Sequence, residues 1–417
     1  MRKFLNGVFV LILFALLFVG IGKAFYMPEE KNEYENRYAE QLQIPTKEGV
    51  LSGEYQNQTE AALGDQLLFA VQIKELYNNA VSSFNKFVLE KVKLLQSRAA
   101  EAVDKEKSVE PEEFKTIDDP NAAYYTLADG NQILKDHLMF KTRFLDGEKD
   151  RLDKRIANIN ASIEKYNTVD FYIYYIERET DINFVTGERS NIYEYIVENL
   201  NLPADHCNRF FVNKFELFDR WFYKTDHHLT NAGAYLCYSN LLNWLLPEEE
   251  PMPHTGEYSI GYFSGSKATG TDTQAYKDII RCYTFDYPEM ITHENGKKIN
   301  YYGAQEAYIQ KRIKKGELLP SVKYSQLFGQ DSGEVRFETP SKDTGSIMLI
   351  GSSMDNAFVR QLAAHFNKLY AVDLRNYSKH MNEKFNLQKY LKKHSDITKI
   401  LIIGDIDSFV LEAFNLY

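Results

Sequence analysis

The sequence lacks the cysteines that a disulfide framework or a zinc site would need. It holds only Cys207, Cys237 and Cys282 in 417 residues, and no two of them form a CxxC pair. An odd number of widely separated cysteines supports neither kind of site. We therefore expect all three to be thiols in the protein core.

An excess of positive charge is also missing. Lys and Arg number 49 against 59 Asp and Glu, which gives a net charge of −10 at pH 7. Proteins bind phosphate backbones through concentrated basic residues, so this balance excludes nucleic acid as a partner. Apolar residues are plentiful, since 44% of the chain is hydrophobic and 14% aromatic. This composition indicates a globular protein with a sizeable core.

One long apolar run is present, at the start of the chain. Residues 4–22 are apolar apart from Asn6 and glycines, and Arg2 and Lys3 precede them. The run is just long enough to cross a bilayer of ~30 Å. Positive charge before it predicts a cytoplasmic N-terminus and an exported remainder. No A-x-A site follows, so we interpret residues 1–25 as a single-pass membrane anchor; a cleaved signal peptide, which would leave a secreted protein, is the alternative.

Residues 26–116 are expected to connect this anchor to the main domain. They begin as a polar tether. Between residues 62 and 95, apolar side chains recur at three- and four-residue spacing, which predicts an amphipathic helix. The charged run EAVDKEKSVEPEEF follows and is typical of a linker.

From residue 117 onward, predicted strands alternate with predicted helices. This alternation predicts an α/β fold with a mainly parallel sheet. Residues 248–344 differ, with short alternating runs rich in Gly, Thr, Lys and Tyr, and are expected to form an insertion of hairpins and loops. The predicted elements are RLDKRIANINASIEKYN (helix), VDFYIYYIE (strand), IYEYIVENL (helix), RFFVN (strand), a helix through Tyr235 and Leu245, SIMLIGSS (strand), AFVRQLAAHF (helix), KLYAVDL (strand), EKFNLQKYLKKH (helix) and ITKILIIGD (strand).

Two polar clusters stand where such sheets collect reactive groups, beyond the carboxyl ends of strands. In the first, Ser352 and Ser353 follow a strand, and a helix is expected to begin near Asp355, so that its N–H groups would stabilise an oxyanion. Alternatively, one of these serines merely caps the helix. In the second, Asp226 and His228 are separated by one residue and can project toward one site, as a Ser-His-Asp triad requires.

The stretch YKTDHHLTNAGAY, taken with LIGSSMDNAF, resembles the DHHW family of bacterial proteins and, more distantly, the alginate O-acetylation proteins. Shorter matches lie along most of the chain: ENRY, SGEY, GDQLLF, YFSGS and VDLRNY. The resemblance implies an SGNH-like, three-layer α/β/α domain over residues 117–417. It also implies a permuted motif order, because the Asp-x-His step precedes the serine.

The resemblance further assigns roles to individual residues. Ser353, two residues after Gly351, matches the nucleophile, His228 the general base and Asp226 the acid that orients it. Gly265, in YFSGS, is expected to offer a further N–H to the oxyanion.

Other residues near these motifs carry competing interpretations. Leu229 stands at the position of the Trp that names the family, which the resemblance places beside the acceptor groove. Arg375 follows the strand KLYAV and either suits an anionic polymer or forms a surface ion pair with Asp373. His227 is expected to be packed or hydrogen-bonded in the core. A metal bound here would need further ligands, and the other histidines form no ligand-spaced pair, so no metal or other cofactor is expected.

These features together predict an extracytoplasmic protein of the bacterial cell membrane. The resemblance implies an O-acetyltransferase or acetylesterase that acts on a cell-surface polysaccharide or exopolysaccharide through an acetyl-serine intermediate. It also implies that a membrane-bound O-acyltransferase supplies the acetyl groups. The alternative is a catalytically inactive polysaccharide-binding or scaffold subunit of an envelope export or modification complex.

Overall fold

The structure is a computed structural model that describes residues 31–32, 37–38, 45–46, 55–56, 59, 62, 124–126, 131–134, 137–270, 277–300, 302, 307–329 and 331–416. The expected membrane segment and nearly all of the amphipathic helix predicted between residues 62 and 95 lie outside these residues. Among the helices that are described, none has the length and apolar character needed to cross a membrane.

The chain divides into two compact units. The first comprises Met1–Ala100 and Thr271–Ala275. In it, strands β1 (Lys31–Asn32) and β2 (Arg37–Tyr38) pair in antiparallel fashion. The second unit, Glu101–Gly270 with Tyr276–Tyr417, holds every element discussed below.

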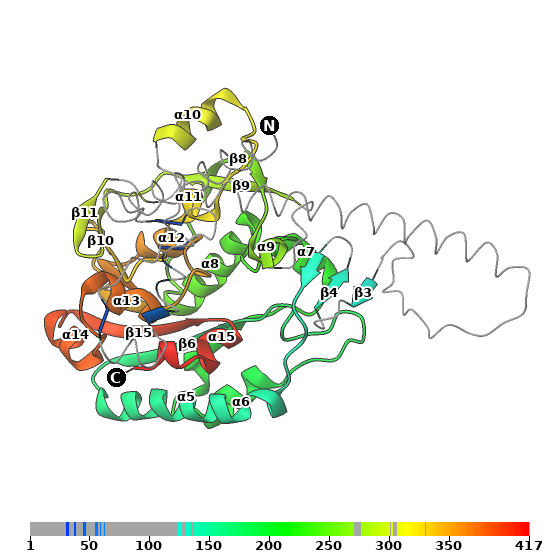
Figure 1. The fold of residues 1–417 in the computed structure, drawn as a ribbon. Coiled ribbons are helices and arrows are strands. Elements are labelled where there is room, and N and C mark those ends of the chain that lie inside the picture. Colours follow the sequence, from blue (N-terminus) through cyan, green and yellow to red (C-terminus); the bar gives the residue numbers. More distant parts are fainter. Residues whose placement is uncertain are drawn as a thin grey trace, which may run out of the picture. The chain divides into compact units, whose positions relative to one another are not determined.

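An eight-stranded mixed sheet forms the centre of the second unit, in the order β11-β10-β12-β14-β13-β15-β6-β7 (Figure 1). The five strands from β14 to β7 are parallel, whereas β12, β10 and β11 join the other edge in antiparallel fashion. The α/β class predicted from the sequence is therefore confirmed. The strands are β6 (Asp170–Ile176), β7 (Cys207–Phe210), β10 (Ile291–Glu294), β11 (Lys297–Ile299), β12 (Glu334–Glu338), β13 (Ser346–Ile350), β14 (Lys368–Val372) and β15 (Ile397–Gly404).

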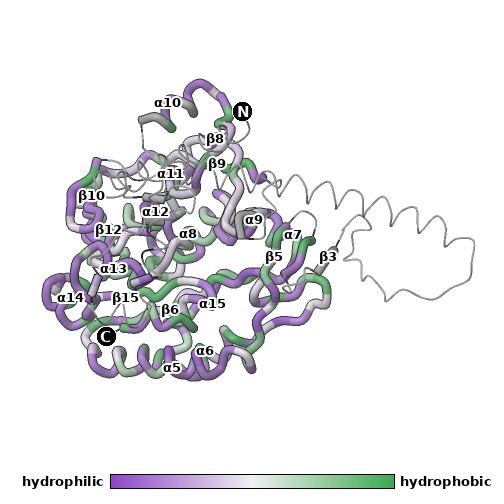
Figure 2. Tube along the Cα trace, viewed as in Figure 1, coloured by the Kyte–Doolittle hydropathy of each residue, from purple (hydrophilic) through white to green (hydrophobic). Residues whose placement is uncertain are grey.

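Helices cover both faces of this sheet because its central strands are apolar on both sides. In β6, Phe171 and Ile173 alternate with Tyr172 and Tyr174, and the two sets belong to different hydrophobic clusters. In Figure 2, apolar residues follow the path of β6 while α5 and α6 carry many hydrophilic residues. One face packs on α5 (Leu145–Lys165), α6 (Ile192–Asn199), α13 (Leu374–Met381), α14 (Leu387–Lys393) and α15 (Ile406–Val410); the other packs on α7 (Phe215–Trp221), α8 (Asn231–Leu245) and α12 (Val359–Ala363).

Part of the segment expected as an insertion belongs to the main sheet instead. Strands β10 and β11 form a hairpin around Asn295 and Gly296, both with positive φ, as a tight type I′ turn requires. Strand β12 then pairs with both β10 and β14. The rest of the segment contains the two-stranded sheet of β8 (His254–Phe263) and β9 (Asp278–Phe285), with α9 (Ser266–Gly270), α10 (Ala307–Lys315) and α11 (Tyr324–Phe328). A three-stranded sheet of β3 (Tyr124–Thr126), β4 (Gln132–Leu134) and β5 (His137–Met139) precedes α5.

Candidate active site

The carboxyl ends of the parallel strands bring polar residues from distant parts of the sequence to one edge of the sheet. Glu177 follows β6, Gly351 follows β13, Asp373 follows β14 and Asp405 follows β15. Open parallel sheets place ligands and reactive groups at this edge. None of the three cysteines follows one of these strands; all are buried and outside any disulfide, as expected.

Asp226 and His228 form a buried pair in the loop between α7 and α8. The Nδ1 of His228 hydrogen-bonds to Asp226 Oδ1, and the backbone N–H of His228 donates to the same oxygen at 2.9 Å. The N–H of Ser266 donates to the other carboxylate oxygen at 2.6 Å. Burial by itself would raise the pKa of Asp226, but the nearby imidazoles and these hydrogen bonds hold that pKa well below its usual range. Asp226 is therefore a carboxylate that fixes the orientation of His228.

The ring nitrogen on the far side of His228 is available as a base. This nitrogen, Nε2, is buried and has no hydrogen-bond partner among the described residues. The ring stacks on Tyr324, with centroids 4.0 Å apart and planes 18° apart. His227 lies against it, also at 4.0 Å, and hydrogen-bonds through Nδ1 to Ser266 Oγ at 2.7 Å. His227 is thus hydrogen-bonded, as expected, although it is only half-buried.

The loop that carries this pair is held at both ends. Thr230 caps α8, because its side chain accepts the N–H of Gly233 at 3.2 Å. At the other end, Asp278 accepts hydrogen bonds from the N–H and the hydroxyl of Thr225, at 2.9 and 2.6 Å, and from the N–H of Lys224 at 3.1 Å. Sequence reasoning missed Asp278 and Tyr324, because neither lies near the motif nor forms a motif of its own.

Ser353 lies in a turn, not at the N-terminus of a helix. Residues 353–358 form the turn, and α12 begins only at Val359 with Phe358 as its N-cap. The expected helix start near Asp355 is therefore wrong, and so is the alternative that a serine caps the helix. The Ser353 side chain is buried. Among the described contacts, no hydrogen bond joins it to His228.

Asp355 shapes this turn. Its Oδ1 accepts the N–H of Ser352 at 2.8 Å. A Cβ on residue 351 would overlap that oxygen, so only glycine fits there. Burial raises the pKa of Asp355 to about 7, opposed by the hydrogen bond from Ser352. Gly351 is thus required by the close approach of Asp355.

Asp331 bonds to the serine turn and lies within the electrostatic influence of His228. Asn356, in the turn, donates to Asp331 Oδ1 at 3.5 Å. Burial raises the pKa of Asp331, while the charges of Arg375 and His228 oppose that rise. A small hollow of about 20 Å³ is bordered by Asp331, Gly351 and Ser352. The two predicted clusters therefore share one electrostatic neighbourhood.

Three further residues were predicted to contact the substrate or the oxyanion. Gly265 lies beside Asp226, but its N–H donates to Thr225 Oγ1 at 3.1 Å, so it is not free for an oxyanion. Leu229 is fully buried in the hydrophobic core. Arg375 donates three side-chain hydrogen bonds to Asp373, from Nε to Oδ1 at 3.0 Å and to Oδ2 at 3.2 Å and from Nη2 to Oδ2 at 2.6 Å, which agrees with the ion-pair interpretation. Its Nη2 also lies 3.7 Å from Asp331.

A buried ionic cluster that the sequence did not reveal lies next to the Asp226–His228 pair. Lys267, on α9, pairs with Glu179 at 2.6 Å, and Arg178 contacts Glu179 at 3.2 Å and Asp405 at 2.6 Å. All four side chains are almost completely buried. Burial lowers the pKa of Lys267, whereas Glu179 opposes the shift. The cluster ties α9, which supplies the Ser266 N–H, to the ends of β6 and β15.

Asp226, His227 and His228 also have the composition of a metal site, with one ligand atom from each within 4.8 Å of the others. However, both carboxylate oxygens of Asp226 already accept hydrogen bonds, and the Nδ1 atoms of both histidines are engaged. A metal bound through these atoms would compete with the contacts that they already make, so the donor set fits an acid–base pair better than a metal centre.

Comparisons with known proteins agree with the motifs. The sequence model of the family described as DHHW protein matches residues 166–372, which confirms the family resemblance. Among curated proteins, no significant match was found. A DHHW family protein from Eubacterium siraeum is 16% identical, with a TM-score of 0.52 over 70% of this chain and 95% of that one. Bacillus cereus PatB1 with a sulfonyl adduct is 14% identical, with a TM-score of 0.50 over 69% and 99%. The O-acetyltransferase domain of Pseudomonas putida AlgJ is 10% identical, with a TM-score of 0.38 over 70% and 94%.

Proposed function

Since the DHHW family model matches residues 166–372, we propose that the chain is an SGNH-like O-acetyltransferase or acetylesterase with a permuted motif order. Its substrate would be a cell-surface polysaccharide or exopolysaccharide. The observation that carries the proposal is the buried Asp226–His228 pair, in which His228 Nε2 has no hydrogen-bond partner among the described residues and can accept the proton of a nucleophile. Ser353, on the neighbouring turn at the same edge of the sheet, is the nucleophile in this scheme.

Each residue has a defined step in the reaction. Ser353 Oγ attacks the acetyl carbonyl carbon while His228 Nε2 takes the hydroxyl proton. Asp226 stabilises the imidazolium that forms. The tetrahedral intermediate then expels the donor alcohol, which receives the proton from His228, and leaves acetyl-Ser353. A sugar hydroxyl or water, deprotonated by His228, attacks this ester, and the departing Ser353 oxygen takes the proton back from His228. The sugar gives transfer and water gives hydrolysis.

The cellular setting belongs to the same proposal. The apolar run at residues 4–22, preceded by Arg2 and Lys3, supports a single-pass anchor with the catalytic unit outside the bacterial cytoplasm. A membrane-bound O-acyltransferase would then supply the acetyl groups.

The nucleophile is tested by covalent labelling. We expect the full chain, treated with a sulfonyl fluoride or a chromogenic acetyl ester, to gain one adduct by intact-mass spectrometry. Peptide mapping should place that adduct on Ser353, because a serine activated by a histidine is far more reactive than others.

The matched controls are Ser353→Ala, Ser352→Ala and His228→Ala. Labelling should vanish in the first, persist in the second and be strongly slowed in the third. A wild-type chain that forms no adduct and hydrolyses no ester would favour the inactive polysaccharide-binding subunit instead.

A further inference from the structure

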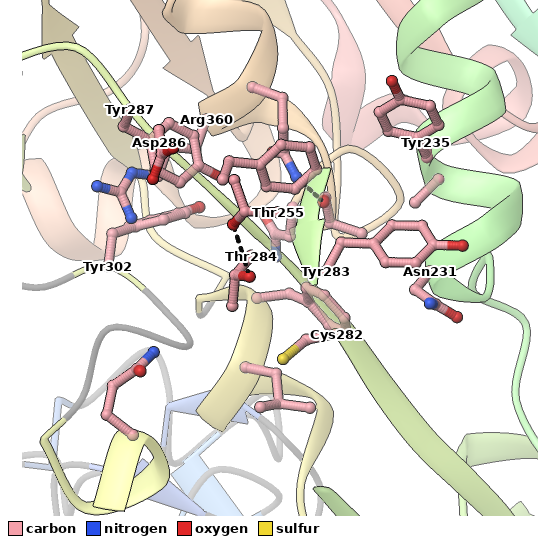
Figure 3. A pocket seen from close by; sticks show the side chains of 18 residues that line it. Asn231, Tyr235, Thr255, Cys282, Tyr283, Thr284, Asp286, Tyr287, Tyr302 and Arg360 are labelled. Carbon is pink, nitrogen blue, oxygen red and sulfur yellow. Dashed lines mark hydrogen bonds between the residues drawn. The ribbon is translucent and has the colours of Figure 1, made fainter. Parts of the chain in front are cut away.

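A second, larger cavity lies beside the serine turn. It measures about 250 Å³ and is walled by β9, α8, α12 and the turn that follows Ser353 (Figure 3). Asn356 and Tyr302 border both this cavity and the small hollow next to Gly351. We call it the aromatic cavity, because its lining includes Tyr235, Tyr283, Phe285, Tyr287, Tyr302 and Phe328.

The aromatic cavity contains a cation, Arg360, that has no anionic partner in the part of the chain that the structure describes. Arg360, in the first turn of α12, is only partly exposed, and its Nε is buried without a hydrogen-bond partner among the described residues. Within the same set of residues, Arg360 forms no ion pair with any carboxylate; Asp286, which also lines the cavity, is exposed. Burial lowers the pKa of Arg360 from its ordinary value, but a guanidinium stays charged in proteins.

The Arg360 side chain is held in place by aromatic rings. Its guanidinium carbon lies 3.8 Å from the centre of the Tyr287 ring, and Tyr302 lies beside it (Figure 3). Such stacking fixes the plane of the guanidinium and leaves the N–H groups at its edge for a ligand. Partly buried charges in proteins are normally paired. A pre-positioned and unpaired guanidinium in a cavity is therefore suited to an anionic group.

The size and the lining of the cavity define the rest of the ligand. Its volume is below the roughly 300–1,000 Å³ of pockets for drug-sized molecules, so it fits about one sugar residue. Aromatic rings supply flat apolar surface, and Asn231, Thr255 and Gln361 add polar groups suited to hydroxyls. Asn356 and Ala357 line the cavity, so such a residue would lie beside the turn that contains Ser353.

We propose that the aromatic cavity binds a sugar residue carrying a carboxylate or phosphate group, with Arg360 contacting the anion. This assignment rests on the proposed function for its substrate class. Under it, the acceptor polysaccharide is an anionic glycan. The net charge of −10 does not oppose it, because recognition depends on the local guanidinium.

Binding is measured by calorimetry with the full chain and without an acetyl donor, so the result is independent of catalysis. The probes are tetragalacturonate, a phosphorylated mannose oligosaccharide and neutral tetragalactose. We expect one of the two anionic probes to bind about 10-fold tighter than the neutral one, which identifies carboxylate or phosphate as the anion. This preference should disappear in Arg360→Gln and be reduced in Arg360→Lys. It should persist in Arg281→Gln, where an exposed arginine lies 3.7 Å from Glu257.

Thermal unfolding separates ligand binding from a structural role. Removing an unpaired, partly buried charge should leave the stability of Arg360→Gln unchanged or raised. Equal binding of acidic and neutral probes by the wild type, or no measurable binding of either anionic probe at millimolar concentration, would overturn the proposal. So would a lost preference accompanied by the same loss in Arg281→Gln. A failed esterase test combined with an Arg360-dependent preference would leave this inference standing and refute only the catalytic proposal.

Discussion

At the scale of single residues, the charge of Asp226 is the most direct test of the acid–base pair. In Asp226→Asn, an amide would face the Ser266 N–H that now donates to the carboxylate at 2.6 Å, and the imidazolium would lose its counter-charge. We expect ester turnover to fall by about 10²- to 10⁴-fold, as when the acid of a serine triad is replaced. The control variant is Asp219→Asn. Asp219 Oδ1 lies 2.6 Å from His137 Nε2 in another aspartate–histidine pair, outside the site. Turnover within twofold of the wild type in Asp226→Asn would exclude the assigned role.

Asp355 gives a prediction about pH and stability. Burial raises its pKa from 3.8 to about 7, so between these values the folded chain holds a proton that the unfolded chain has released. The contribution of Asp355 to wild-type stability should therefore fall as pH rises from about 4 to 7, by at most about 4 kcal/mol, and then level off. Asp355→Asn keeps an acceptor for the Ser352 N–H and removes the ionisation. Its stability relative to wild type, from denaturant unfolding at pH 4, 6 and 8, should rise across this window.

The control for this measurement is Asp150→Asn, at an exposed position of α5. Its stability difference from wild type should change little between pH 4 and 8. A pH-independent difference in Asp355→Asn would contradict the raised pKa.

At the scale of elements, the contact between β8–α9 and the α7–α8 loop depends on Gly265. A Cβ at this position would overlap the Cβ and Oδ2 atoms of Asp226. We expect Gly265→Ala to displace the carboxylate, to lower the free energy of unfolding by about 1–3 kcal/mol and to reduce turnover more than Ser266→Ala does. The contrasting variant is Gly147→Ala in α5, where no atom lies within 4 Å of the added Cβ and helix propensity favours alanine by about 0.5–1 kcal/mol. Wild-type turnover in Gly265→Ala would show that this close packing is not needed for the site.

At the scale of the whole chain, the sequence predicted what local patterns encode. Apolar periodicity predicted α5 and β6, and the separation of Asp226 and His228 by one residue predicted their pairing. The start of α12 was misplaced, because the Asp355 side chain bonds back to the Ser352 N–H and stabilises a turn.

Long-range contacts left no such pattern. Tyr324 reaches His228 across nearly a hundred residues, and the Lys267–Glu179 ion pair spans a similar separation. Strands β10 and β11 are short and of mixed polarity, so no apolar alternation marks them in the sequence. Their place in the main sheet comes from the pairing of β10 with β12. Residues that surround the site are therefore found from the fold, whereas residues within its motifs are found from the sequence.

The base and the nucleophile are positioned by two different segments of the chain, and this has an evolutionary consequence. The segment from β8 to α11 holds the Asp226–His228 pair: Ser266 donates to Asp226, Asp278 binds the preceding Thr225, and Tyr324 stacks on His228. Ser353, in contrast, follows a strand in the interior of the parallel sheet. Mutations that remodel the first segment need not disturb β13. We expect lineages of this family to diverge fastest at those positions between residues 254 and 328 that do not contact the Asp226–His228 loop, so that new acceptor preferences arise on an inherited nucleophile.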